Sequence, residues 1–183
     1  MTLHILHEGI HDKKFFETFL KNDLLTACEC KKLKPYKYKT DASVQKYIKT
    51  IKSRGDKFLI FGDADFQNTG TLKPKNYTEL HKHFCSKFAV KTNCNKLVFV
   101  VVEEIESWYL AGFDKIFCKK NNVKYHANTE NVTAEIFAKS RIRPEQTEDQ
   151  FRNWLLKNNY SVTEANKRNK SFKRFYDVVL KKT

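Results

Sequence analysis

Two runs of large apolar residues constrain the fold of this chain more than any other feature of its sequence. They are Phe58–Phe61 and Leu97–Val102. Neither run leaves a polar face, which is typical of strands covered on both sides in a parallel sheet. Because a parallel sheet is covered by the helices that connect its strands, these runs predict helices on both faces.

Strand and helix patterns alternate along the chain as far as Gly112. Strands are expected at residues 2–7, 33–40, 57–62 and 97–102, and helices at about 12–24, 41–54, 77–88 and 103–112. This order predicts an α/β fold with a mainly parallel central sheet of about four strands, flanked by helices through right-handed crossovers.

Residues 113–183 show no strand pattern. Helical spacing of apolar residues appears at 133–139, 145–156 and 171–180. We therefore expect an α/β domain over residues 1–112 and a helical extension over residues 113–183 that packs on it.

Positive charge is concentrated in two segments of a chain whose net charge is +14. Residues 31–57 hold ten Lys and Arg against two acids, and residues 165–183 hold seven against one. Such segments suggest a polyanionic partner, for which nucleic acid is the usual choice, and solvated helix faces are the alternative. The candidate nucleic-acid contacts are Lys37, Lys39, Lys46, Lys49, Lys52, Arg54, Lys167, Lys170 and Lys173.

The cysteines and the N-terminal residues indicate a cytoplasmic protein. Five cysteines without a paired CxxC spacing predict neither a disulfide framework nor a four-thiolate zinc site, so free thiols are expected. No signal-peptide pattern precedes the first strand, and no apolar run is long enough to span a bilayer, so no membrane association is expected.

Acidic residues follow three of the four expected strands. Glu8 follows the first strand, Asp63 and Asp65 follow the third, and Glu104 and Glu106 come after the fourth. Because the carboxyl ends of parallel strands lie at one edge of the sheet, we expect these acids to gather there. Neighbouring carboxylates repel each other unless a cation or a shared proton lies between them, which favours a divalent metal.

The residues that carry this pattern resemble the TOPRIM family. The run Leu3-His-Ile-Leu-His-Glu-Gly-Ile-His-Asp12, together with Phe61-Gly-Asp-Ala-Asp65, is similar to the glutamate and Asp-x-Asp motifs of that family. The family includes topoisomerases, primases, recombination proteins and nucleases of the overcoming-lysogenization-defect type. The resemblance implies a Rossmann-like TOPRIM fold in which Glu8, Asp63 and Asp65 bind magnesium and act in catalysis.

A second stretch resembles small stand-alone TOPRIM-like proteins, several of which are associated with phage defence. It is Glu104-Ile-Glu-Ser-Trp-Tyr-Leu-Ala111. An aspartate often follows the alanine in those proteins, whereas Gly112 occupies that place here. Related domains often act within a complex, so an ATPase partner or a homodimer stays open.

These features predict a nuclease that depends on Mg²⁺ or Mn²⁺ and hydrolyses phosphodiester bonds of DNA or RNA. Two or three carboxylates, with a substrate phosphate, are enough to hold magnesium. Glu104 or Glu106 would add ligands for a second ion, as in two-metal hydrolysis. Glu8 could instead act as a general acid or base, and a TOPRIM-like protein that binds nucleic acid or a partner without cutting is the main alternative.

Two other enzyme classes have related motifs. His7-Glu-Gly-Ile-His11 matches the HExxH pattern of zinc proteases, which requires both histidines on one helix. The haloacid-dehalogenase phosphatases also use an Asp-x-Asp pair, but theirs follows the first strand and continues to a threonine, where this chain has Gln67. Both classes fit the expected elements less well than a nuclease does.

Overall fold

A four-stranded parallel sheet forms the centre of the protein. The computed structural model describes residues 1–64, 77–141, 143 and 145–181. The strands lie in the order β2-β1-β3-β4, and every neighbouring pair is parallel. The α/β, Rossmann-like fold class predicted from the sequence is therefore confirmed. The strands are β1 (Thr2–His7), β2 (Lys32–Lys37), β3 (Lys57–Ala64) and β4 (Val98–Val102).

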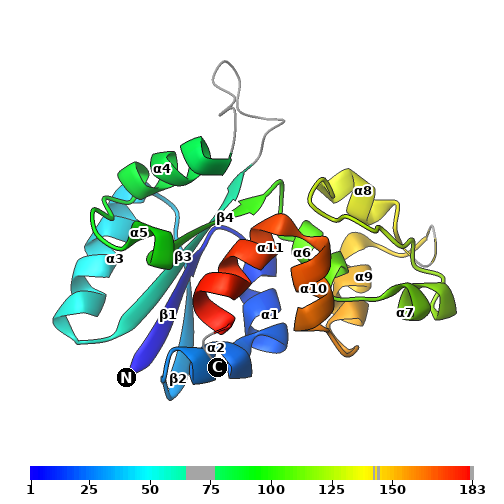
Figure 1. Ribbon diagram of the computed structural model, residues 1–183, viewed down its shortest axis with the longest axis horizontal. Helices are drawn as coiled ribbons and strands as arrows, with labels where there is room; N and C mark the ends of the chain where they lie inside the picture. The colour runs from blue at the N-terminus through cyan, green and yellow to red at the C-terminus, as the bar shows by residue number, and fades with distance from the viewer. Residues whose placement is uncertain (65–76, 142, 144, 182–183) are drawn as a thin grey trace.

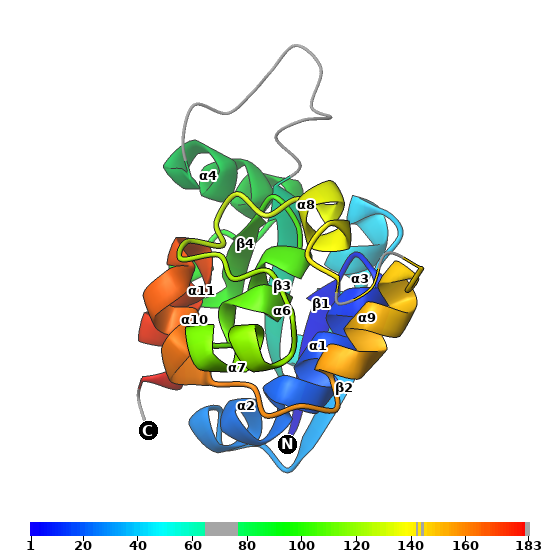
Figure 2. The ribbon, with the colours of Figure 1, turned by 90° about the vertical axis from the view of Figure 1, so that its right-hand side faces the viewer.

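Helices cover both faces of this sheet (Figure 1). One face carries α3 (Asp41–Ser53), α4 (Tyr77–Lys87) and α5 (Cys94–Leu97). The other carries α1 (Ile10–Phe19), α2 (Lys21–Ala27), α6 (Glu106–Ala111), α11 (Lys170–Phe175) and the π-helix η1 (Tyr176–Leu180). Beyond that second face lie α7 (Lys115–Lys120), α8 (Ala134–Ala138), α9 (Glu148–Leu155) and α10 (Val162–Arg168), seen from their side in Figure 2.

The alternating side chains of β3 explain why both faces are covered. Phe58 and Ile60 belong to the core beneath α3 and α4, whereas Leu59 and Phe61 belong to the core beneath α1 and α11. Successive side chains of a strand point to opposite faces, so an apolar run without a polar side needs a layer on each. The two apolar runs of the sequence therefore lie in β3 and β4, except that Leu97 is the last residue of α5.

Trp108 lies at the centre of the larger core. Its ring packs on Phe15 of α1, on Phe61 of β3, and on Phe172 and Phe175 of α11. Ring pairs of this kind contribute roughly 0.5–1.5 kcal/mol each beyond the area they bury. Residues from the 113–183 segment thus complete the same core as the sheet.

Arg168 fixes the C-terminal segment to the last turn of α6 and to the chain that follows it. Its buried guanidinium donates hydrogen bonds to the carbonyl oxygens of Leu110, Ala111 and Phe113, and to that of His126. Burying a guanidinium without hydrogen-bond acceptors costs free energy, so these carbonyl groups stabilise the buried position of the side chain.

Some helices differ from those expected. The helix after β4 begins at Glu106 rather than at residue 103, because Glu103 has a left-handed backbone with φ 60°. Helices α7 and α10 were not predicted, since six or seven residues give too few turns for a periodic pattern. The helices expected at 133–139, 145–156 and 171–180 are present as α8, α9 and α11 with η1, with shorter bounds for the first two.

The prediction that all cysteines are free thiols is wrong. Cys85 and Cys94 form a disulfide that joins α4 to α5, while Cys28, Cys30 and Cys118 take part in no disulfide. The two residues are nine apart in the sequence, but the turn between the helices brings their Cα atoms to 6.0 Å. That separation suits a disulfide.

Within the described ranges, no helix combines the length and the apolar character that crossing a membrane requires.

Candidate active site

Glu8 and Asp63 lie at the carboxyl ends of β1 and β3, the two central strands. Between these strands, the direction in which the chain adds successive strands to the sheet reverses. The chain runs from β1 to β2 on one side and reaches β3 and β4 on the other. Ligands of open α/β sheets bind beyond the carboxyl ends of the strands at such a switch point. Leu6 pairs with Ile60, and Glu8 is the first residue after β1. The negative charge of Glu8 raises the pKa of Asp63, so the two carboxylates interact although they are 55 residues apart in the sequence.

Three further acids surround Asp63. Burial raises the pKa of Asp63 well above its ordinary range, and the negative charges of Asp12, Glu8, Glu106 and Glu104 raise it further. Burial, with the charges of Glu106 and Glu8, also raises the pKa of Asp12 to about 7. The carboxyl ends of β1, β3 and β4 thus concentrate negative charge that a bound cation would offset.

Tyr38 holds Glu8 in place. Its hydroxyl donates to Oε1 of Glu8 over 2.8 Å and lies 3.1 Å from the carbonyl oxygen of Phe61. Burial and the charge of Glu8 raise the pKa of Tyr38, so the phenol keeps its proton and stays a donor. The backbone N–H of Tyr38 also donates to the carbonyl of His7, which extends the pairing of β1 with the residue after β2.

Asp12 fixes the turn that carries Glu8. Its Oδ2 accepts the backbone N–H of Gly9 at 2.7 Å, as part of the capping of α1. His7 is buried beside it, with Nδ1 3.8 Å from the same oxygen. Burial lowers the pKa of His7 to about 4, so its imidazole is neutral at pH 7.

The zinc-protease alternative does not agree with this turn. His7 is the last residue of β1, and α1 begins only at Ile10. His7 and His11 therefore do not lie on one face of one helix, which the HExxH pattern needs. His11 instead lies 3.8 Å from Oδ1 of Asp149 in α9.

Glu106 has a partner that the sequence did not indicate. Nη2 of Arg152, from α9, lies 2.6 Å from Oε1 of Glu106, and both side chains are buried. The same guanidinium contacts Glu148 and Asp149 in its own helix. Glu106 is thus partly neutralised, and its role as an accessory acid stays a prediction. Glu104 follows β4 and adds its charge to the surroundings of Asp63.

Asp65 and Gly112 are two further positions that the sequence singled out. Asp65 lies outside the described residues. Gly112 lies against Tyr160, and a Cβ atom at this position would overlap the tyrosine ring. The structure therefore has no room for the aspartate that the resembling proteins often carry there.

The closest grouping of possible metal ligands lies away from the carboxylates. Throughout the described ranges, His81, Cys85 and Cys94 are the one group of three such side chains close enough together to share an ion. The carboxylates at the switch point are spaced more widely. Magnesium usually keeps several waters and takes only one or two protein carboxylates with substrate phosphates, so this spacing is compatible with it.

The predicted basic contacts form two groups on opposite faces of the sheet (Figure 1). Lys46, Lys49 and Lys52 are exposed along α3, and Lys37, Lys39 and Arg54 are exposed near its two ends. In the described part of the chain, none of these six forms an ion pair with an acid. Lys167 and Lys173, in contrast, pair with Glu164 and Asp177 at 2.8 Å, while Lys170 is exposed.

No family model matches this chain, and the searches of curated proteins and of solved structures also found no match. The fold and the geometry of the carboxylates therefore carry the functional argument.

Proposed function

We propose that the protein is a metal-dependent nuclease that hydrolyses phosphodiester bonds. One observation supports the proposal: Glu8 and Asp63 follow the two central strands, and the charges of Glu8 and further carboxylates raise the pKa of Asp63. Such a concentration of negative charge at a ligand-binding edge is unfavourable without a cation and is typical of sites that bind one. The TOPRIM resemblance of the same residues supports the proposal.

Glu8 and Asp63 would hold Mg²⁺ or Mn²⁺, with Asp65 as an expected third ligand. The observations that fit this ion are the oxygen-only donor set and the raised pKa values of Asp63 and Asp12. When bound, the ion would polarise the phosphate and lower the pKa of an attacking water. Glu104 and Glu106 are the candidates for a second ion.

The surrounding residues would position these carboxylates. Tyr38 donates to Oε1 of Glu8, so Oε2 would be the oxygen that binds an ion or accepts a proton. Asp12 holds the Gly9 turn, which sets the direction in which Glu8 leaves β1. Arg152 compensates the buried charge of Glu106.

Nucleic acid would contact the basic side chains of the 31–57 segment. The six candidate contacts in this segment are exposed and form no ion pair with an acid among the described residues, so their charge is available for phosphates. Lys167 and Lys173 already form ion pairs with acidic side chains, which reduces the positive charge that they present to phosphates. The α3 group is therefore the main contact surface of the proposal.

The proposal is tested by incubating the purified protein with single-stranded DNA, double-stranded DNA and RNA in the presence of Mg²⁺ or Mn²⁺. We expect cleavage of at least one substrate by the wild type and none in the presence of a chelator. Glu8→Ala and Asp63→Asn should each abolish it. Asp23→Asn, which changes an exposed acid of α2 far from the switch point, is the matched control.

Asp63→Asn separates chemistry from folding. Because burial and like charges disfavour the ionised form of Asp63, a neutral side chain of the same size should leave the melting temperature unchanged or raise it. Loss of cleavage with intact stability would support the site. Cleavage that persists in both Glu8→Ala and Asp63→Asn would contradict it.

The second candidate is a protein that binds nucleic acid without cutting it. The wide spacing of the described carboxylates favours this candidate, because they do not form a closed three-ligand group. It predicts salt-dependent binding by the wild type, equal binding by Glu8→Ala, and no cleavage with any substrate or ion.

A further inference from the structure

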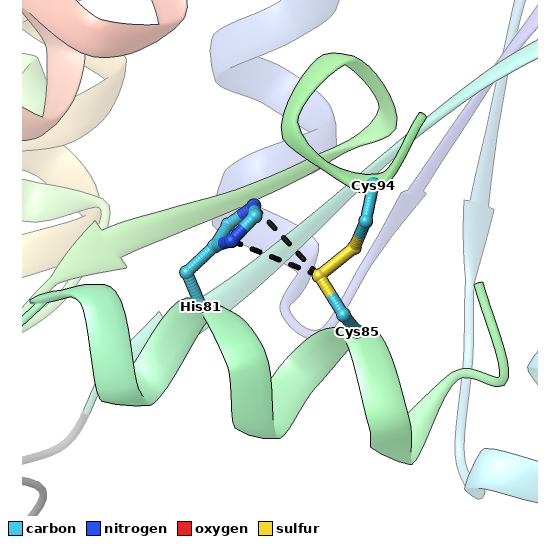
Figure 3. Close-up of side chains that lie close together, drawn as sticks. All are labelled: His81, Cys85 and Cys94. Carbon is cyan, nitrogen blue, oxygen red and sulfur yellow. Dashed lines mark hydrogen bonds between the residues drawn. A yellow bond between two sulfur atoms is a disulfide. The ribbon is translucent and has the colours of Figure 1, made fainter. Parts of the chain in front are cut away.

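A second group of ligands lies on the opposite face of the sheet from α1. His81 and Cys85 are one turn apart on α4, and Cys94 is the first residue of α5 (Figure 3). Nδ1 and Nε2 of His81 lie 3.7 and 3.8 Å from Sγ of Cys85, which is bonded to Sγ of Cys94. All three side chains are partly exposed, so an ion in solution has access to them.

A backbone carbonyl selects the ring nitrogen of His81 that is free to bind a metal. Nε2 lies 3.1 Å from the carbonyl oxygen of Val98, the first residue of β4. A carbonyl oxygen only accepts, so Nε2 carries the proton and donates it, and Nδ1 is left with its lone pair directed elsewhere. Metal-binding histidines usually have their other ring N–H fixed in this way by a carbonyl or a carboxylate.

We propose that, once the disulfide is reduced, His81, Cys85 and Cys94 bind one Zn²⁺ ion. A dithiol reductant would exchange with the Cys85–Cys94 bond, gaining a disulfide of its own while the protein gains two thiols. Zn²⁺ would then displace the two thiol protons and bind both thiolates together with Nδ1 of His81. The reaction releases two protons and leaves the oxidation state of zinc unchanged.

The geometry fits a tetrahedral ion. Zinc–sulfur bonds of about 2.3 Å and zinc–nitrogen bonds of about 2.0 Å place a nitrogen roughly 3.6 Å from a sulfur in a tetrahedron. His81 and Cys85 already have this separation. The two sulfur atoms would have to separate to about 3.8 Å, which a change of side-chain torsion at Cys94 provides. Two thiolates and an imidazole prefer zinc to magnesium, and water would take the fourth position.

This zinc site is separate from the carboxylates. It lies at the amino end of β4, while Glu104 and Glu106 follow its carboxyl end. Five strand residues separate the two ends by roughly 16 Å. We therefore assign the ion a structural role: it would join α4 to α5 in reducing conditions, as the disulfide does in oxidising conditions.

The test uses the full chain, reduced with a phosphine that is then removed without air. Titration with Co²⁺ should produce the visible absorption of tetrahedral cobalt bound to thiolate at one ion per chain, and Zn²⁺ should displace it. The oxidised chain should give no such spectrum. Reduced protein with zinc should also melt at a higher temperature than reduced protein without it, which is a readout independent of colour.

Variants decide which side chains bind. Cys85→Ser, Cys94→Ser and His81→Ala should each weaken zinc binding by roughly 100-fold or more. His83→Ala on the same helix and Cys28→Ser, at a partly exposed cysteine outside the disulfide, are matched controls that should bind as the wild type does. Equal cobalt spectra before and after reduction, unchanged binding by Cys94→Ser, or no binding by the reduced wild type would each overturn the proposal.

Discussion

The hydroxyl of Tyr38 lies 2.8 Å from Oε1 of Glu8, although the two residues are 30 positions apart. We expect Tyr38→Phe to lower the cleavage rate about tenfold and to raise the Mg²⁺ concentration needed for half-maximal activity. The reason is that a hydrogen bond to a charged group contributes roughly 1.5–3 kcal/mol, and its loss leaves the carboxylate free to rotate. Cleavage assays over a range of Mg²⁺ concentrations measure both effects.

Tyr47→Phe is the matched control for this prediction. In the wild type, the hydroxyl of Tyr47 lies 2.9 Å from Nδ1 of His4. His4 lies toward the amino end of β1, whereas the carboxylates are at the opposite end of the sheet. The control should cleave as the wild type does. If Tyr38→Phe showed normal activity and normal Mg²⁺ dependence, Tyr38 would have no positioning role.

The carboxylate cluster should make stability depend on both pH and metal. The pKa of Asp12 rises on folding from 3.8 to about 7. A carboxyl group whose pKa is raised by folding contributes fully to stability when the pH is below its pKa in the unfolded state. This contribution is lost as the pH rises through its pKa in the folded state. Asp12→Asn does not titrate, so its melting temperature relative to the wild type should increase from about pH 4 to about pH 8.

Mg²⁺ should reduce that difference at the higher pH. A cation at the switch point offsets the negative charge that disfavours ionised Asp12 in the folded state. Thermal melts of wild type and Asp12→Asn, with and without Mg²⁺, measure the effect, and Asp23→Asn serves as the exposed control. A difference that is the same at both pH values would show that Asp12 has no raised pKa.

The ion pair of Arg152 with Glu106 predicts a large loss of stability when one partner is removed. Arg152→Met should lower the free energy of unfolding by about 3–5 kcal/mol, because it leaves a buried carboxylate without compensation. Glu106→Gln combined with Arg152→Met should recover part of this loss. Chemical denaturation of the single and double variants measures the coupling, and strictly additive effects would contradict it.

The sequence predicted the parts of this fold that depend on local patterns. Phe58–Phe61 and Leu97–Val102 identified two central strands because a run without a polar side needs cover on both faces. The expectation of a parallel sheet led to the prediction that Glu8 and Asp63, which follow two of its strands, lie at its carboxyl edge. Tyr38 and Arg152 were missed because their partners are 30 and 46 residues away, and a tyrosine or arginine in a loop or helix has no pattern that marks such a contact.

The Cys85–Cys94 disulfide was missed for a different reason. A spacing of nine residues is not a recognised motif, and the pairing depends on the left-handed backbone of Asn93, which turns the chain into α5. His81 is one helical turn from Cys85, a spacing that could have marked a ligand pair on α4.

The position of Gly112 predicts intolerance of any side chain there. Gly112→Ala should lower the free energy of unfolding by about 1–3 kcal/mol, because the added methyl group would overlap the ring of Tyr160 in a closely packed core. Gly112→Asp should cost more, since it also buries a charge. Thermal or chemical denaturation measures both. Gly55→Ala is the comparison, because a methyl group there meets no other atom and costs only the backbone strain of a positive φ. A fully stable Gly112→Asp variant would contradict the packing.

The two basic groups should differ in their effect on nucleic-acid binding. Each phosphate neutralised by a lysine releases counterions, so the slope of log K against log salt concentration changes by roughly 0.7–0.9 per lost contact. We expect replacement of Lys46, Lys49 and Lys52 by alanine to reduce the slope by about 2–3, since these side chains are exposed and have no acidic partner among the described residues. Replacement of Lys167, Lys170 and Lys173 should reduce it by less than about 1, because two of the three are already paired with Glu164 and Asp177. Fluorescence anisotropy at several salt concentrations measures both slopes. If the second triple variant lost more of the slope than the first, nucleic acid would bind across α10 and α11 instead of α3.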